Sequence, residues 1–179
     1  MFGDVEGRDA FTVNPVLLRP RSRGRVRLRS ANPFHWPLLH ANYYQDELDL
    51  RVMVEGIKLG VELGETAGYR RWGARLHPRA VPGCEQHPFR SDAYWGCAAR
   101  TLSTNLHHQA GTCRMGPAAE RSRGAVVDAQ LRVHGVHRLR VVDASVMPTI
   151  ISGHPAGVVY MIAEKAADMI KEAWGAVNV

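Results

Sequence analysis

Long hydrophobic runs are absent from this sequence of 179 residues. No stretch of about 18 uncharged apolar residues occurs, so no segment is predicted to cross a membrane as a helix. The opening residues, MFGDVEGRDAF, are acidic and lack the apolar core that a secretory signal peptide needs. We therefore expect neither a membrane span nor a signal peptide within this chain.

Cysteine is scarce, with three residues at positions 84, 97 and 113. The single C-x12-C spacing between Cys84 and Cys97 does not match the ligand spacings of zinc sites. It suits a disulfide that closes a small loop in an oxidising compartment, and it suits two free thiols equally well. Spacing alone leaves these two alternatives open. Cys113 is expected to be a small buried apolar residue in a turn.

Internal repeats and low-complexity segments are also absent. The hydrophobic fraction of 45% is ordinary for a globular protein and is sufficient for a core. The length suits one domain or one compact piece of a larger protein.

The net charge of +6 is concentrated in one segment, RPRSRGRVRLRS, at residues 19–30. Alternating arginines of this kind can bind phosphates or nucleic acid. They are also typical of the solvated face of an edge strand, and Val26 and Leu28 take the other parity. No aromatic residues interleave with the arginines to stack on bases, so we favour the edge strand and expect no nucleic-acid partner.

The first half of the chain predicts one strand and two helices. VRLRS, at residues 26–30, is typical of a strand. Residues 46–64 have apolar positions at helical spacing, with Asp46 as the N-cap and Gly64 or Gly68 at the end. A second helix is expected from Ser91 or Asp92 through SDAYWGCAARTLST, and residues 70–90 are expected to be loop.

The second half predicts two strands and a final helix. β-Branched runs at residues 125–135 and 139–145 are separated by a glycine turn, which favours two strands. Residues 154–174 form an amphipathic helix pattern with Pro155 in the first turn, where proline is tolerated. Its apolar face is expected to comprise Val158, Ile162, Ala166, Met169 and Ile170. The mixture of elements predicts an α+β fold, an antiparallel sheet with helices, and not a βαβ repeat.

The stretch NLHHQAGTCRMG, at residues 105–116, raises the question of function. His108 precedes a tight glycine turn, which would hold its ring on a defined loop. His154 stands just before a predicted helix, where the positive end of the helix dipole favours the neutral ring. A neutral imidazole can exchange a hydrogen bond or a proton with an alcohol oxygen.

Several stretches closely resemble signatures of one enzyme family, the glucose-methanol-choline (GMC) oxidoreductases. These are HHQAGTCRMG at residues 107–116, LRVVDASVMPTIISGHP at 139–155 and MIAEKAADMI at 161–170. The segments at residues 14–30 and 42–59 resemble the start of that family's C-terminal region. The motifs GHP and DAYWGC look most similar to its arthropod glucose-dehydrogenase branch. The resemblance implies an FAD-dependent oxidase or dehydrogenase that acts on alcohols.

The resemblance also implies a division of the chain. Residues 12–138 would be the substrate-binding C-terminal domain, and residues 139–174 would be a strand and helix that pack on an FAD domain. The dinucleotide fingerprint G-x-G-x-x-G is absent, which indicates the C-terminal portion of a longer enzyme whose N-terminal FAD domain lies outside this chain. The alternative is a truncated, non-catalytic module that folds or binds a ligand or partner without turnover.

The resemblance assigns roles to six residues. His108 would be the catalytic base that removes the hydroxyl proton, and His154 would orient the substrate oxygen, with the two rings facing each other across one cavity. The positions matched to the FAD site are His107, Asp143, Ala144 and Pro155. A zinc site built from His107, His108 and His154 ranks last, because no carboxylate or thiolate set accompanies them at standard spacing, and no resident metal is expected.

Three further expectations follow from the resemblance. The arthropod branch is secreted, so a Cys84–Cys97 disulfide and an extracellular full-length protein are expected. The partners expected are a small-molecule alcohol or sugar and the N-terminal FAD domain. Exposed apolar surface is expected beside Asp143 and His154, where that domain would pack.

Overall fold

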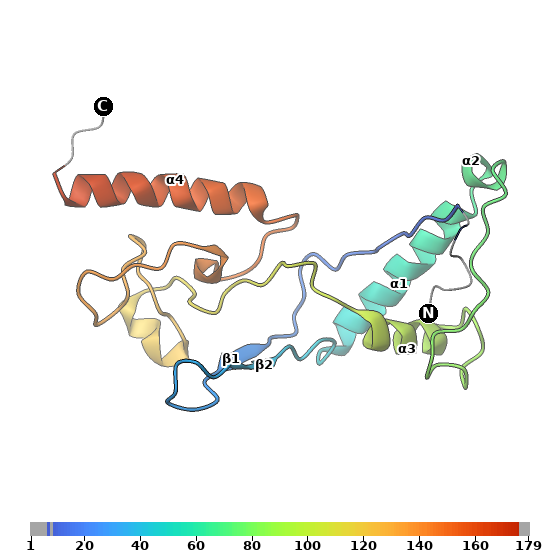
Figure 1. Cartoon of the computed structure of the whole chain (residues 1–179), viewed down its shortest axis with the longest axis horizontal. Coiled ribbons are helices and arrows are strands. Elements are labelled where there is room, and N and C mark those ends of the chain that lie inside the picture. The colour runs from blue at the N-terminus through green and yellow to red at the C-terminus, as the bar shows by residue number, and fades with distance from the viewer. Residues whose placement is uncertain (1–6, 8, 176–179) are drawn as a thin grey trace. The chain divides into compact units, whose positions relative to one another are not determined.

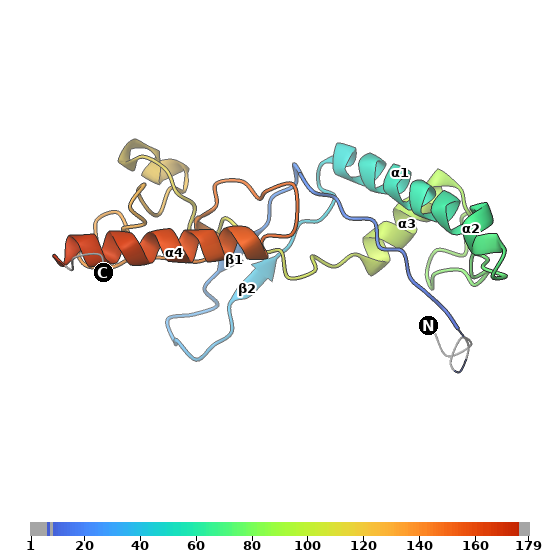
Figure 2. The ribbon, with the colours of Figure 1, turned by 90° about the horizontal axis from the view of Figure 1, so that it is seen from above.

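The computed structural model describes residue 7 and residues 9–175, in two compact units that divide between Thr104 and Asn105. Figures 1 and 2 show the elements of each unit. The division lies earlier in the chain than residue 138. Assigning residues 12–138 to substrate binding and 139–174 to an FAD domain stays a prediction.

Helices dominate the first unit. It contains β1 (Arg25–Arg27), β2 (Leu38–His40), α1 (Glu47–Gly64), α2 (Ala67–Arg70) and α3 (Asp92–Leu102). The predicted caps are confirmed, because Asp46 accepts a hydrogen bond from Leu48 N and Ser91 accepts one from Tyr94 N. The short helix α2 was missed by the sequence analysis.

The core of the first unit lies between α1 and α3, which are side by side in both views (Figures 1 and 2). Val54 of α1 packs with Val81, Tyr94, Trp95 and other buried residues. The Tyr94 hydroxyl accepts a hydrogen bond from Val81 N at 3.0 Å, which ties the loop before α3 to the helix. The predicted disulfide between Cys84 and Cys97 is present, with Cα atoms 5.8 Å apart.

Asp49 joins α1 to the extended segment that precedes β1. It is 2% exposed, and its carboxylate accepts hydrogen bonds from Arg21 N at 2.9 Å and Ser22 N at 2.7 Å. Burial raises the pKa of this carboxyl, but the hydrogen bonds from Arg21 and Ser22 and the charge of Arg23 outweigh burial and hold the pKa below its ordinary value of 3.8.

The sheet is smaller than expected. β1 pairs with β2 in antiparallel register, with Val26 opposite Leu39. All six residues are exposed, and so is Leu28, at 85%. The strand predicted at residues 26–30 is confirmed at Val26 and Arg27 only. Val26 and Leu28 have no core to cover within the described part of this unit.

The second unit is built mainly from loops around one long helix. It contains two 3₁₀ helices, η1 (Ala118–Arg123) and η2 (Ala144–Val146), and the helix α4 (Ala156–Ala173). The two strands predicted at residues 125–135 and 139–145 are wrong. These segments make only isolated bridges, Val127 with Met115 and Val133, and Arg132 with Arg140.

The core of the second unit lies beneath α4. Val127, Leu131, Val146 and Ala166 are buried together, with Ile162 packed against them. The predicted apolar face of α4 is therefore correct at Ile162 and Ala166, whereas Ile170 is 38% exposed. Other large apolar side chains of the unit are also exposed, among them Val136, Leu139, Tyr160, Met161 and Trp174.

Candidate active site

A tight turn positions His108. Asn105 O accepts a hydrogen bond from His108 N at 2.9 Å, and the two central residues, Leu106 and His107, have positive φ angles of 51° and 61°. Two positive φ values with this hydrogen bond are typical of a type I′ turn. The Asn105 side chain accepts a second hydrogen bond, from His107 N at 3.1 Å. Two hydrogen bonds to Asn105 therefore fix the backbone conformation of the turn that carries His108.

Backbone hydrogen bonds join the segment after this turn to η2. Gly111 N donates to Ala144 O at 3.3 Å, Cys113 N to Ser145 O at 3.0 Å and Met115 N to Val146 O at 2.8 Å. Gly111 has a φ of 84°, and a Cβ atom there would lie 3.1 Å from Met147 O. Glycine is thus needed where the two segments approach each other.

The start of α4 positions His154. Pro155 is the N-cap, buried and in helical conformation, and it supplies no side-chain cap. The preceding His154 is exposed. Because a proline has no N–H and its φ is fixed, the chain enters the helix at a restricted angle with the His154 ring just outside the first turn.

The turn and the helix start bring the two predicted catalytic rings together. His154 Nδ1 lies 3.0 Å from His108 Nε2, although the residues are 46 positions apart. The ring centroids are 4.9 Å apart and the ring planes are inclined by 80°. The predicted proximity is confirmed, but the rings hydrogen-bond directly and do not face each other across a cavity.

This contact restricts the protonation states of the pair. One of the two nitrogens must donate and the other must accept, so the contact holds when both rings are neutral or when one is charged. If both rings were charged, both nitrogens would carry hydrogens and the bond would be lost. The pair can therefore gain or lose one proton while it stays assembled.

Of the four positions predicted to contact FAD, His107 and Pro155 adjoin the pair in sequence. His107 belongs to the turn, Ala144 O is bonded to Gly111 N, and Pro155 caps α4. Asp143 is exposed, and its side chain accepts a hydrogen bond from Ser145 N at 2.8 Å as the N-cap of η2. Asp143 therefore has a local structural role, and the four cofactor contacts stay predictions.

Asn105 is the residue that the sequence analysis missed. It fixes the turn through both its main-chain and side-chain oxygens. The sequence does contain an indication of this role, because asparagine is a common turn residue whose side chain accepts a hydrogen bond from the backbone N–H two positions on. The same signal occurs in many loops, so it did not single out this position.

Other histidines have ordinary local partners. His134 Nε2 lies 2.9 Å from Gly116 O, and His35 Nδ1 lies 2.8 Å from Ser30 Oγ. Across residue 7 and residues 9–175, no group of three or more His, Cys, Asp and Glu side chains is arranged to hold a metal ion. In the same part of the chain, no helix has the length and apolar character to cross a membrane.

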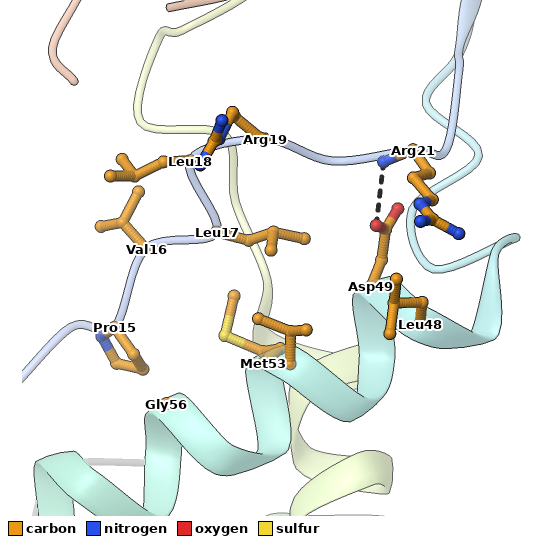
Figure 3. A pocket seen from close by; sticks show the side chains of 11 residues that line it. Pro15, Val16, Leu17, Leu18, Arg19, Arg21, Leu48, Asp49, Met53 and Gly56 are labelled. Carbon is orange, nitrogen blue, oxygen red and sulfur yellow. Dashed lines mark hydrogen bonds between the residues drawn. The ribbon is translucent and has the colours of Figure 1, made fainter. Parts of the chain in front are cut away.

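A pocket of about 370 Å³ lies within the first unit, between the extended segment Pro15–Arg21 and α1 (Figure 3). Its wall is mostly apolar, with Leu17 and Met53 on facing sides and two arginines, Arg19 and Arg21, on the extended segment. The one carboxylate in the lining, Asp49, already accepts two backbone hydrogen bonds. The pocket offers binding surface but no group free to take a proton.

Known proteins resemble this chain over most of its length. Residues 20–163 match the family model described as GMC oxidoreductase. A glucose dehydrogenase [FAD, quinone] of Drosophila pseudoobscura pseudoobscura is 47% identical over 167 residues, which is 93% of this chain and 26% of that protein. An ecdysone oxidase of Bombyx mori is 42% identical, over 92% of this chain and 23% of the oxidase.

A solved structure gives the same result. The formate oxidase of Aspergillus oryzae RIB40, described in a study of FAD modification, superposes with a TM-score of 0.74 at 34% identity, covering 88% of this chain and 26% of the oxidase. The chain thus spans about a quarter of the length of the relatives that it matches. The match over most of the chain shows that it belongs to the GMC oxidoreductase family.

Proposed function

We propose that this chain is the C-terminal, catalytic part of an FAD-dependent oxidoreductase that oxidises an alcohol, with His108 as the proton acceptor and His154 as its partner. The observation that carries the proposal is the 3.0 Å contact between His154 Nδ1 and His108 Nε2. These residues come from a turn and a helix start that are far apart in sequence. Two exposed or half-buried imidazoles in direct contact are suited to passing one proton.

Removal of the hydroxyl proton is the step assigned to this chain. A substrate hydroxyl beside the pair would replace the hydrogen bond between the rings. His154 Nδ1–H would then donate to the alcohol oxygen, and His108 Nε2 would accept the hydroxyl proton. The charged His108 ring would return that proton to solvent after the carbonyl product leaves.

The start of α4 fits part of a flavin site. This helix of 18 residues has no side-chain cap, and a Cβ at Gly157 would meet nothing within 4 Å. Its first turn therefore presents free N–H groups and the positive end of the helix dipole, which suit an electron-rich ring or a phosphate. We assign FAD contacts to His107, Asp143, Ala144 and Pro155. When bound, FAD would accept the hydride from the alcohol carbon.

The substrate is proposed to be a sugar or another alcohol, because the names of similar proteins include glucose dehydrogenase and ecdysone oxidase. The apolar pocket beside α1 supports a binding role for the segment 12–138, since its volume is within the range of small-molecule sites. The Cys84–Cys97 disulfide supports an extracellular location. Detection of the protein, with this disulfide intact, in culture medium or body fluid would test that location.

The catalytic proposal can be tested in a chimera. This chain would replace the matching C-terminal region of the Drosophila pseudoobscura glucose dehydrogenase, and flavin reduction by glucose and other alcohols would be followed. His108→Ala should lower the rate about 10²–10⁴-fold, the usual contribution of a general base. His154→Asn should lower it less, because an amide can still hydrogen-bond the alcohol oxygen.

His137→Ala is the matched control, since His137 is exposed and lies outside the contact. If all variants bind flavin as the parent does, their lower rates are due to a slower reaction and not to loss of the cofactor. Parent-like oxidation by His108→Ala would contradict the proposal. A chimera that binds FAD and oxidises none of the alcohols would favour the alternative, a non-catalytic binding module.

A further inference from the structure

We propose that the His108–His154 pair also binds one transition-metal ion of the kind that prefers imidazole ligands, Cu²⁺ or Zn²⁺. Imidazole nitrogens bind these ions at about 2.0–2.1 Å. Two such nitrogens on one square-planar or tetrahedral ion therefore lie about 2.9–3.4 Å apart. His154 Nδ1 and His108 Nε2 lie 3.0 Å apart in their hydrogen bond, so the two ligands start at a separation close to the one that the ion requires.

The rings are able to turn toward a shared ion. In the hydrogen bond, each nitrogen points at the other, whereas metal binding requires both lone pairs to point at a position beside the line that joins them. His154 is exposed, His108 is half-buried, and the ring planes are inclined by 80°. The χ2 torsion of histidine is broad, so small rotations can turn both lone pairs toward one ion, without a change in the backbone and with the two nitrogens still close to this separation.

Metal binding also sets the protons of the pair. Each ring must be neutral and must carry its hydrogen on its outer nitrogen, His154 Nε2 or His108 Nδ1, because the ion takes the lone pairs of the inner ones. A singly charged pair must release one proton to solvent before the ion binds. Binding should therefore weaken as the pH falls.

The site should be accessible and of moderate affinity. No third His, Cys, Asp or Glu ligand accompanies the pair among the residues described, so water would complete the coordination shell. A bound ion would occupy the lone pair of His108 Nε2 and block its use as a proton acceptor. This inhibitory consequence rests on the proposed function, but binding of the ion does not.

Binding can be measured on the tag-free full chain with Cu²⁺ alone, in a Cys113→Ser background that removes the free thiol. Calorimetry should resolve a class of one ion per chain, and electron paramagnetic resonance should show two nitrogen ligands. His108→Gln and His154→Gln should each weaken that class by at least about tenfold, since changes even in the outer shell of a metal site commonly cost that much. Circular dichroism would verify that both variants are folded.

His137→Ala again serves as the control, and it should bind as the Cys113→Ser parent does. Equal affinity in the parent and in both glutamine variants would overturn the proposal, because the ion would then be held elsewhere among the nine histidines. In the chimera, Cu²⁺ could bind at the pair and leave alcohol oxidation unchanged. That result would support the metal site and contradict the catalytic role of His108.

Discussion

The two units of the chain maintain their structures by different means. The first packs α1 against α3 around Tyr94 and Trp95, and a disulfide joins α3 to the loop before it. The second has one long helix over a small core, and its other segments are held by two 3₁₀ helices, isolated bridges and turn hydrogen bonds. The histidine pair lies in the second unit. Loops on a packed support commonly carry reactive groups, because the side chains there can be aimed individually.

Removal of the disulfide should have the largest effect on stability. The double substitution Cys84→Ser, Cys97→Ser should destabilise the first unit by about 3 kcal/mol, the contribution expected for a loop of this size. Urea denaturation followed by the fluorescence of the buried Trp95 would measure it. Cys113→Ser is the control in the second unit, and an unchanged unfolding midpoint in the double variant would disprove the expectation.

Asp49→Ala should have a similar or slightly smaller effect on the same unit. It leaves Arg21 N and Ser22 N without their buried acceptor, which should cost about 2–3 kcal/mol. Asp49→Asn is the matched comparison, because its single amide oxygen keeps part of the acceptor. Hydrogen exchange should locate the loss at residues 21–22 and α1, and protection there equal to the parent would contradict the prediction.

The same carboxylate predicts acid sensitivity of the first unit. Its pKa is lowered by folding, so its contribution to stability is complete above pH 3.8 and is lost as the pH falls through the lower value of the folded state. Asp49→Asn should remove this part of the acid transition. The denaturation midpoints of the parent and of Asp49→Asn would be compared below pH 3.8. If the midpoint of the parent falls no faster than that of the variant, the prediction is wrong.

Gly111→Ala should have an intermediate effect, in the second unit. The positive φ and the approach of Met147 O make any side chain unfavourable, at a cost of about 1–3 kcal/mol. Gly153→Ala is the control, because a Cβ there meets only Ile151 Cδ1, at 4.0 Å. Hydrogen exchange should increase at residues 111–115 and 144–146. If hydrogen exchange increased only in the first unit, the prediction would be wrong, and the stability of one unit would depend on the other.

Asn105→Ala should have the smallest effect on stability, about 1 kcal/mol, since it removes one exposed hydrogen bond to His107 N. Its effect on the His108–His154 contact should be easier to detect. The imidazole NMR signals of His108 and His154 should lose their mutual contact, and Asn105→Asp should restore it because a carboxylate can still accept the bond. Unchanged signals in the alanine variant would exclude Asn105 as a positioning residue.

What the sequence predicts well is local. The helices were found because Asp46 and Ser91 cap apolar segments of helical period, and both caps form. The strands at residues 125–135 and 139–145 were wrong because β-branched runs indicate extended backbone but do not identify a partner. Pairing depends on distant segments, and here each forms single bridges only. Residue spacing alone could not place His108 beside His154; the family resemblance did.

The turn at residues 105–108 has a consequence for protein engineering. Leucine and histidine occupy the two left-handed positions, 106 and 107, where glycine or asparagine would adopt the same backbone with less strain. A selection for heat resistance alone would favour Gly or Asn at these positions. A selection for turnover would act on what the Leu106 and His107 side chains contribute to the reaction. If libraries at these two positions gave different residues under the two selections, stability and activity would conflict at this turn.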